Sequence, residues 1–378
     1  MTGAARPLPV LAFQEISVRE LSGLAPAIRC SSVFPPACVS VPAPEFGDSE
    51  GSLRRRGIEN FANGWGAASF VADEVARWTL PDALVHGPFG IVTVGKYVIA
   101  ESTIHAPLHL PAYRKEAGVM CLPAPSRVLE VEKGLHFASG NYGNYYHWML
   151  DVVPKLQIAP FCDFGFDGML LMPPGETAFH RCTTELLDRL GLGYRHLGAG
   201  EAARVAELVL IPNMTACGPR PHPALSQFFT RLAAEIGARS LPDRRLYVSR
   251  GGSGNRPLAN EAAVIRLVSA NGYDVCDPGQ MRLRDQIAVF ASATHIIAPH
   301  GAGLANIVFC RPGARLCELH MPTYENWCFR RLAAIRDMRY GLVLGAVDPA
   351  DEREEWVHSQ RWHAPLDRID AVMRQMDS

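Results

Sequence analysis

Two histidines stand in settings where a side chain can do chemistry. The first is His147, which is followed four residues later by Asp151. On a helix this spacing puts both side chains on one face. An aspartate can fix the tautomer of a neighbouring histidine, and either residue can act as a general base. The same pair could also bind a metal, or form an ordinary polar pair on an exposed helix face.

Aromatic residues surround this pair, because the segment from Asn144 to Asp151 reads NYYHWMLD. Aromatic rings beside polar groups suit the wall of a sugar-binding cleft, and they suit a plain core as well. The segment predicts a helix that starts near Asn144, and Pro154 predicts a kink or a stop.

The second histidine, His300, opens the turn HGAG directly after an apolar run that ends at Pro299. We interpret this stretch as a strand, a glycine-rich turn and a short helix. Glycines permit positive φ and a close approach of backbone N–H groups to a ligand, while a helix start adds partial positive charge. The turn therefore predicts a phosphate or diphosphate site for a nucleotide-type ligand. Glu318 ends the next predicted strand, where it could accept hydrogen bonds from ribose hydroxyls or be an ordinary surface residue.

A third segment, Arg250 followed by GGSGNR, comes directly after a predicted strand at 245–249. Arginine side chains can hold phosphate through two hydrogen bonds. The segment lacks the Gly-Lys-Ser/Thr ending of a P-loop, and a flexible surface loop is the alternative. The patterns GxxxxGK, HExxH and GxSxG are absent, which argues against a P-loop NTPase, a zincin and an α/β-hydrolase.

Strand-like and helix-like segments alternate along most of the chain, which predicts parallel βαβ units in an α/β fold. Residues 1–60 are rich in proline, glycine and serine and predict an irregular lead-in. Residues 241–244 resemble a linker, so we predict two α/β domains, 1–240 and 241–378, that meet at a cleft. The other predicted elements are strands at 127–137, 169–172, 208–212 and 273–276, two strands around Gly95-Lys96, and helices at 179–190, 224–238, 261–271 and 283–291.

Composition narrows the class of protein. The 378 residues carry a formal net charge of −1, so binding to long nucleic acids is not expected. The ten cysteines form no CxxC pair and no metal-finger spacing, which is typical of a reducing compartment. The sequence shows no signal-peptide pattern and no apolar run of the roughly 20 residues that span a bilayer. We expect a soluble cytoplasmic protein, with a membrane-bound acceptor left open.

Three segments in this order resemble glycosyltransferase family 61, including its bacterial branch of capsular polysaccharide biosynthesis proteins. The matching residues are NYYHWMLDVVPKL at 144–156, LYVSR with NRPLANE at 246–261, and DQIAVFASATHIIAPHGAGLANIVF at 285–309. The resemblance covers roughly residues 85–319.

The resemblance implies a GT-B architecture, in which two Rossmann-like domains face each other across a cleft. It also implies an inverting transfer from a nucleotide sugar, usually UDP-linked, to a glycan or glycolipid acceptor, without a metal or other cofactor. On the acceptor side we expect His147 and Asp151 as the catalytic pair, with Asn144 and Trp148 beside them. The expected donor-binding residues are Arg250, Asn255, Arg256, His300, Gly301, Ala302, Gly303, Leu304, Asn306 and Glu318.

Two other functions compete with transfer. A catalytically silent GT-B protein could bind a nucleotide sugar or glycan as a sensor or scaffold. A metal-dependent hydrolase could use His147 and Asp151 as ligands, but it needs a third ligand that the sequence does not identify. The sequence leaves the sugar, the nucleotide base, the linkage, the oligomeric state and the choice of base between His147 and Asp151 open.

Overall fold

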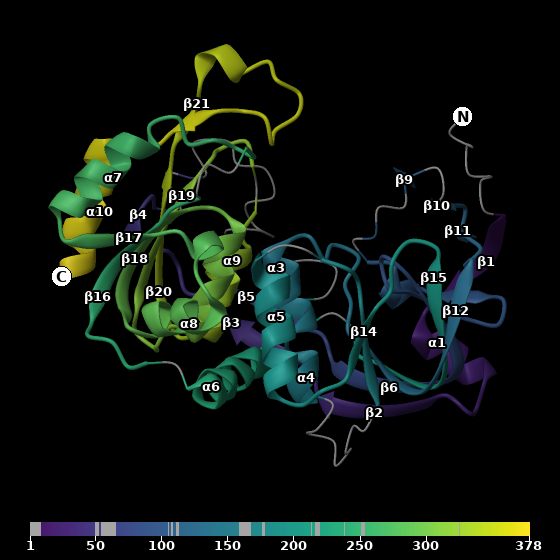
Figure 1. Cartoon of the computed structure of the whole chain (residues 1–378). Coiled ribbons are helices and arrows are strands. Elements are labelled where there is room, and N and C mark those ends of the chain that lie inside the picture. The colour runs from purple at the N-terminus through teal and green to yellow at the C-terminus, as the bar shows by residue number, and fades with distance from the viewer. Residues whose placement is uncertain are drawn as a thin grey trace, which may run out of the picture. The chain divides into compact units, whose positions relative to one another are not determined.

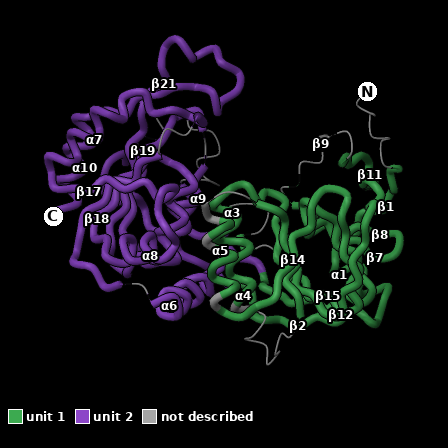
Figure 2. Tube along the Cα trace, in the orientation of Figure 1, with its two compact units in different colours: residues 1–36, 74–217 green, residues 37–73, 218–378 purple. Residues whose placement is uncertain are grey.

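The structure is a computed structural model of the whole chain (Figure 1). It describes residues 9–49, 53, 66–104, 106, 109–110, 113–158, 168–175, 178–212, 214–215, 220–237, 239–250, 254–324 and 326–378. The chain divides into two compact units, each made of two stretches (Figure 2). Unit 1 consists of residues 1–36 and 74–217, and unit 2 consists of residues 37–73 and 218–378.

A mixed β-sheet forms the framework of unit 1. In the described part of the chain it has twelve strands in the order β14-β13-β12-β15-β6-β7-β8-β1-β11-β10-β9, with β2 paired to β6. Strands β14, β13, β12 and β15 run parallel, whereas β15 pairs antiparallel with β6. The strands are β1 Val10–Ile16, β2 Arg29–Phe34, β6 Val75–His86, β7 Ile91–Val94, β8 Tyr97–Ile99, β9 His109–Leu110, β10 Tyr113–Glu116, β11 Val119–Pro123, β12 Arg127–His136, β13 Met169–Met172, β14 Tyr194–His196 and β15 Glu201–Leu210.

The predicted strands at 127–137 and 169–172 are confirmed as β12 and β13, and the strand at 208–212 is the end of the longer β15. In β12, Leu129 and Val131 pack against the core while Val128 and Glu130 are exposed, as the alternation of a strand requires. Only the four parallel strands match the predicted Rossmann-like pattern. Most of the remaining strands pair antiparallel, and β1 with β8 forms one further parallel pair, so unit 1 has a mixed sheet instead.

The expected irregular lead-in at 1–60 is wrong for the part of it that the structure describes. Strand β1, helix α1 (Val18–Leu24) and strands β2, β3 (Ala37–Ser40) and β4 (Phe46–Gly47) lie there. The prolines that suggested irregular structure fall in the connections between these strands. Helix α1 starts at a capping box between Ser17 and Glu20, and its Val18 and Leu21 enter the core of unit 1.

The helix predicted from Asn144 is confirmed as three consecutive segments. They are α3 (Tyr145–His147), the π-helical turn η2 (Trp148–Val152) and α4 (Lys155–Ile158). The Asn144 side chain caps the start by accepting a hydrogen bond from the Tyr146 N–H at 2.9 Å. Pro154 lies between η2 and α4. Helix α5 (Ala178–Arg189) matches the helix predicted at 179–190.

Unit 2 is built on an all-parallel sheet. Its strand order is β17-β16-β18-β19-β20-β4, six strands among the described residues. The strands are β16 Arg244–Val248, β17 Tyr273–Cys276, β18 Ala293–Pro299, β19 Arg315–His320 and β20 Arg339–Leu344, with the small pairs β3–β5 (Ser69–Ala72) and β21 (Ala346–Val347)–β22 (Trp362–His363) outside the sheet. The helices are α6 Ala224–Ile236, α7 Glu261–Ala270, α8 Leu283–Ala291, α9 Cys328–Ile335 and α10 Leu366–Asp377, and the 3-10 helix η5 is Ala302–Phe309.

Helices cover both faces of this sheet (Figure 1). Apolar side chains of α7 and α10 form one core with Tyr247, Ile297 and Val343 of the strands. Helices α6, α8 and α9 pack against η5, the 3-10 helix that follows β18 in the chain. From β16 the chain moves to β17 on one side and then returns to β18 on the other. The strand order therefore reverses between β16 and β18, and this is the topological switch point of the sheet.

The units do not follow the predicted boundary between residues 240 and 241. Helix α6 belongs to unit 2, because Phe229 packs on Phe309 with ring centroids 5.3 Å apart and Arg336 donates to the Ser226 carbonyl. The N-terminal stretch Ala37–Asp73 also belongs to unit 2, where β4 extends the parallel sheet beside β20. The α/β class is confirmed, with the correction that each unit combines two separate stretches of the chain.

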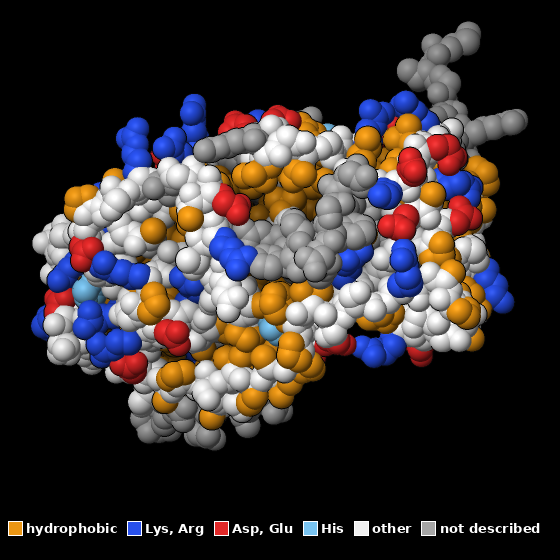
Figure 3. Space-filling view, turned by 90° about the horizontal axis from the view of Figure 1, so that it is seen from below, with side chains coloured by type: hydrophobic (Ala, Val, Ile, Leu, Met, Phe, Trp, Pro, Cys, Tyr) orange, Lys and Arg blue, Asp and Glu red, His pale blue; other side chains and the backbone are white. Residues whose placement is uncertain are grey.

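Charge is mixed over the surface. On the face drawn in Figure 3, basic and acidic side chains both occur, and neither sign forms a continuous field. Among the described residues, no helix combines the length and the apolar character needed to cross a membrane.

Candidate functional site

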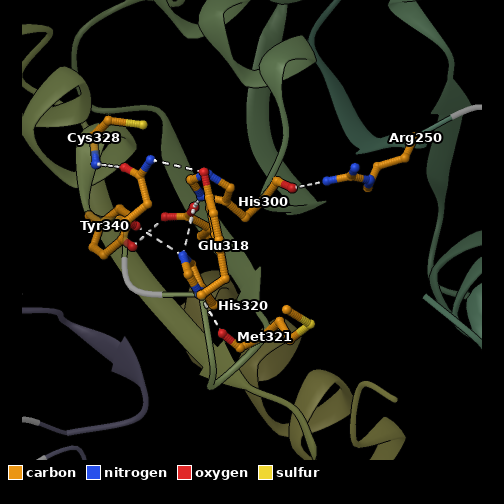
Figure 4. Close-up of polar contacts among 9 residues, drawn as sticks. Arg250, His300, Glu318, His320, Met321, Cys328 and Tyr340 are labelled. Carbon is orange, nitrogen blue, oxygen red and sulfur yellow. Dashed lines mark hydrogen bonds and ion pairs between the residues drawn. The ribbon is translucent and has the colours of Figure 1, made fainter. Parts of the chain in front are cut away.

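Arg250 and His300 lie side by side at the switch point of unit 2. Strands β16 and β18 are parallel neighbours, with Tyr247 opposite Ile297, and each residue follows the carboxyl end of its strand. The Arg250 Nη1 donates a hydrogen bond to the His300 carbonyl oxygen (Figure 4). Two segments that are 50 residues apart in the sequence are thus joined at the edge where open α/β sheets bind their ligands.

Arg250 is held in place by two further hydrogen bonds. Its backbone N–H donates to Glu261 Oε1 at 3.3 Å, and its Nη2 donates to the Asn255 carbonyl oxygen at 2.5 Å. Burial, together with the nearby charge of Arg256, lowers the pKa of Arg250 to about 10. The side chain stays cationic at neutral pH, and an anion at this edge would relieve the repulsion between the two guanidinium groups.

Arg256 lies in the same region, on a backbone with φ of 50°. Its guanidinium carbon is 4.0 Å from the centre of the Tyr324 ring, and its Nη1 is 2.6 Å from His358 Nδ1. This contact requires the His358 nitrogen to accept, so His358 is neutral here. Burial and Arg256 lower the pKa of His358 in agreement with that form. Sequence reasoning missed Tyr324 and His358, which lie outside the recognisable motifs.

The turn after β18 differs from the expectation in one respect. Gly301 has φ of −177°, an extended backbone, so positive φ is not the reason for a glycine there. A Cβ atom at Gly301 would lie 3.1 Å from Arg250 Nη1, and the close approach of that side chain is the reason instead. The short helix predicted after the turn is confirmed as η5, which begins at Ala302.

Buried residues of η5 hold the turn from Gly301 to Gly303 in place. Leu304 and Asn306 are buried. The Asn306 Nδ2 donates to Gln286 Oε1 at 2.9 Å and to the Gly303 carbonyl oxygen at 3.1 Å. These contacts connect the turn to α8, and the fully buried Asn306 side chain is not exposed to a ligand.

A buried network fixes the His300 ring (Figure 4). His300 Nδ1 contacts Glu318 Oε1, and the Tyr340 hydroxyl donates to Glu318 Oε2 at 2.6 Å. Glu318 is fully buried. The predicted hydrogen bond from ribose to this carboxylate therefore stays a prediction, and the burial of Glu318 argues against it. Burial raises the pKa of Glu318, and burial with the charges of Arg256 and Arg250 holds the pKa of His300 well below its usual range.

His320 completes this network. Together with His300 and Glu318 it places three potential metal ligands within 4.8 Å of one another. The Nδ1 and Nε2 of His320, however, lie 3.0 Å and 2.9 Å from the carbonyl oxygens of Met321 and Asn326. At least one of these nitrogens donates a proton to its carbonyl oxygen and offers no lone pair to a metal. We therefore describe the cluster as a hydrogen-bonded network.

In unit 1 the predicted pair is formed. His147 Nδ1 lies 3.0 Å from Asp151 Oδ2, and Asp151 is fully buried. Thr215 donates to Asp151 Oδ1 through its backbone N–H at 3.0 Å and its hydroxyl at 2.8 Å. The π-helical turn η2 carries Asp151, and such turns are frequent at functional sites. The carboxylate thus accepts at both oxygens, which makes His147 Nδ1 a donor. In the neutral ring, the second nitrogen, Nε2, is then the acceptor.

Trp148 belongs to the core. Its ring is fully buried, packs on Phe137 and His180, and donates from Nε1 to Thr183 Oγ1 at 2.6 Å. A fully buried ring is not exposed to an acceptor. Asn144, half-buried, uses its side chain for the helix cap described above.

A buried lysine next to this pair escaped the sequence reasoning. Lys155 follows Asp151 by four residues, and this spacing was the signal that could have found it. Its Nζ donates to the Ala138 carbonyl oxygen at 2.9 Å and lies 3.5 Å from His136 Nδ1. Burial lowers the pKa of Lys155 to about 7, with the Asp151 charge opposing, and burial with Lys155 lowers the pKa of His136 to about 3.

Lys155 should make stability depend on pH. An unfolded lysine ionises near pH 10.4, so between about pH 7 and pH 10 the unfolded chain binds more protons than the folded one. The free energy of unfolding should therefore rise with pH across this window, by up to about 1.4 kcal/mol per pH unit. Urea unfolding at several pH values should show this rise in the natural protein and in Lys96→Met, which removes an exposed lysine. Lys155→Met should lack it, and an equal rise in that variant would contradict the assignment.

Comparison with known proteins gives a match to a family model. No curated protein matches the chain. The family model described as Glycosyltransferase 61 matches residues 145–317, a segment that contains His147, Asp151, Arg250 and His300. These four residues of the candidate sites thus fall within the matched segment, and over that segment the chain is similar to glycosyltransferase family 61.

Proposed function

We propose that the protein is an inverting glycosyltransferase that moves a sugar from a nucleotide-sugar donor, of the UDP type, to a hydroxyl group of a glycan or glycolipid acceptor. The observation that carries the proposal is the meeting of Arg250 and His300 at the switch point of a parallel sheet, within the segment that matches the family model. Ligands of open α/β sheets bind at such points, and arginine suits a diphosphate.

The donor site of this proposal lies in unit 2. Arg250, Arg256 and His300 face the diphosphate, and the turn from Gly301 to Gly303 offers backbone N–H groups. Asn255 holds Arg250 through its carbonyl oxygen. Charge on the leaving diphosphate is offset by these fixed groups, which is the role that a divalent metal has in other transferases. We therefore propose that no metal or other cofactor takes part.

His147 is the general base of this proposal, and Asp151 is its positioning residue. Asp151 is buried and accepts three hydrogen bonds, so its carboxylate does not reach an acceptor. It fixes the tautomer of His147 in which Nε2 accepts a proton, as aspartates do in hydrolase triads. The His147 side chain is 16% exposed, which leaves it accessible to an acceptor hydroxyl.

The reaction balances as a single displacement. The acceptor oxygen forms a bond to the anomeric carbon while the bond from that carbon to the diphosphate oxygen breaks. His147 Nε2 takes the proton of the acceptor hydroxyl, and the nucleoside diphosphate leaves with the electron pair of the broken bond. Attack from the face opposite the leaving group inverts the anomeric carbon.

Broader features of the proposal rest on the likeness to the family. They are a GT-B-like architecture in which unit 2 is the Rossmann-like donor domain, a role in surface or capsular polysaccharide synthesis, and action in the cytoplasm on an acceptor that a membrane could carry. The family match supports transferase activity and leaves the donor and acceptor to experiment.

Nucleoside diphosphates should stabilise the folded protein. A ligand at about 100 times its Kd adds about 2.7 kcal/mol to the free energy of unfolding, so the melting temperature should rise. We expect UDP to give the largest shift in a panel with GDP, CDP and ADP, and the shift should be equal in EDTA and in Mn²⁺. A shift that requires Mn²⁺ would contradict metal independence. Binding of UDP-sugars without transfer or donor hydrolysis would favour the silent-binder alternative.

A further inference from the structure

His300 is held by a carboxylate in a cage of aromatic rings, an arrangement that diphosphate binding alone does not require. Its ring centroid lies 4.7 Å from that of His320, 5.0 Å from Phe329 and 5.3 Å from Tyr324, so the ring has one orientation. Its Nδ1 is committed to Glu318. The other ring nitrogen, Nε2, is therefore the atom that His300 presents to a ligand.

Burial raises the pKa of Glu318, while His320 and the Tyr340 hydroxyl act to lower it. Its Oε2 accepts from the Tyr340 hydroxyl at 2.6 Å, and its Oε1 lies 3.9 Å from His320 Nε2. Because both nitrogens of His320 face carbonyl oxygens, this ring suits the doubly protonated, cationic form. Burial acts against that charge and lowers the pKa of His320 to about 4, while Glu318 and the two carbonyl groups act to raise it. His320 is therefore neutral near pH 7, and Glu318 is the acidic group of this network that contacts His300.

The groups that face His300 have a net positive balance before a ligand binds. Strand β19 contributes Glu318 and His320, and Tyr340 of β20 acts through Glu318. Tyr324, in the loop after β19, and the apolar Phe329 of α9 contact the ring. The two positive charges come from the segment after β16, which carries Arg250 and Arg256. The two arginines and burial favour a neutral ring. A nucleoside diphosphate that pairs with the arginines would reverse this balance, because it adds two or more negative charges.

We propose that binding of a nucleoside diphosphate at the switch point draws one proton from solvent onto His300, with Glu318 as the residue that holds the resulting imidazolium. This inference rests on the proposed donor site. Nε2 gains the proton and donates it in a hydrogen bond to a phosphate oxygen, while Nδ1 continues to donate to Glu318. The proton returns to solvent when the nucleotide leaves. The site thus gains a third cation only while the diphosphate is present.

The proposal predicts the sign of the pH dependence of affinity. Since the bound state holds one more proton, affinity rises as pH falls, by up to about tenfold per pH unit between the pKa of His300 in the free and in the bound protein. Above that window the affinity is constant. The terminal phosphate itself takes up a proton near pH 6, so measurements belong at about pH 7.5 and above.

Isothermal titration calorimetry of the full chain with UDP tests the proposal. The observed enthalpy, plotted against the ionisation enthalpy of several non-phosphate buffers at about pH 7.5, gives the number of protons taken up. We expect between about half a proton and one proton for the natural protein. His300→Gln keeps a side-chain amide that can donate to Glu318, and it should reduce the uptake to near zero.

Two further variants distinguish an effect on the charge around His300 from a general effect on folding. Glu318→Gln keeps the shape of the side chain and should also abolish uptake, because a neutral amide does not stabilise an imidazolium. His363→Gln is the matched control, because His363 is an exposed histidine of β22 that the donor site does not include, and it should leave the uptake unchanged. If Glu318→Gln fails to fold, the comparison of His300→Gln with His363→Gln decides.

Three results would overturn the proposal: UDP binding without proton uptake, uptake that survives in His300→Gln, or uptake that disappears in His363→Gln. In these cases the donor site itself still stands. Absence of nucleotide binding to the natural protein would remove both the proposed function and this inference.

Discussion

Replacing Asp151 by asparagine should lower kcat by about 10²- to 10⁴-fold, with UDP affinity unchanged. The asparagine can still accept from Thr215, but it then turns its NH₂ group toward His147 Nδ1. That contact favours the tautomer with the proton on Nε2, which is unable to accept a proton from the acceptor. Steady-state kinetics with an active donor and acceptor pair, and calorimetry with UDP, measure the two quantities separately.

The same substitution elsewhere provides the control. Asp370 and Arg374 form an i,i+4 pair on the exposed face of α10, and Asp370→Asn should leave turnover unchanged. His147→Gln should be as damaging as Asp151→Asn, because the pair acts as a unit. If the pair only stabilises its helix, it is worth about 0.2–0.5 kcal/mol. Near-normal turnover in both variants would then move the base to another residue.

Replacing Arg250 by alanine should weaken UDP binding by about 10- to 100-fold, since charge-assisted hydrogen bonds contribute about 1.5–3 kcal/mol. Arg250 joins the ends of two strands through the carbonyl oxygens of His300 and Asn255, so its loss removes a cation and loosens the turn that faces the ligand. Arg250→Lys should recover only part of the affinity, because lysine lacks the planar fork that makes both contacts.

Arg266 on the exposed side of α7 gives the matched control for this charge change. Arg266→Ala should bind UDP as the natural protein does. Equal affinity in Arg250→Ala and Arg266→Ala, measured by calorimetry at one ionic strength, would remove Arg250 from the donor site. The comparison also excludes a general effect of net charge on binding.

The features that follow from the regular geometry of helices and parallel sheets could be predicted. His147 and Asp151 meet because a helix brings residues four apart together, and Arg250 and His300 meet because parallel neighbours end at one edge of a sheet. Strand β12 could be predicted because its alternation is carried by adjacent residues.

The features that depend on distant packing could not be predicted. Glu318 looked like a surface carboxylate that could face ribose, and its burial depends on Tyr340, which lies 22 residues further on. From the sequence, Trp148 could belong to a cleft wall or to the core. Its indole N–H is paired with Thr183 inside the protein, which is a contact of a core residue. Thr215, 64 residues after Asp151, carries no local signal that it fixes the carboxylate. In each case the sequence does not show which distant residue the side chain contacts, and the residue type alone does not determine whether the side chain is buried or exposed.

The stretch Ala37–Asp73 has a consequence for how the protein is made on the ribosome. This stretch leaves the exit tunnel early, but the sheet that β4 joins is encoded after residue 218. The 144 residues from 74 to 217 are synthesised in between, which takes roughly 7–30 s at about 5–20 residues per second. During that interval β4 has no sheet to join, so its segment is a natural target for chaperones. Unit 2 is completed only when the last part of the chain has been released.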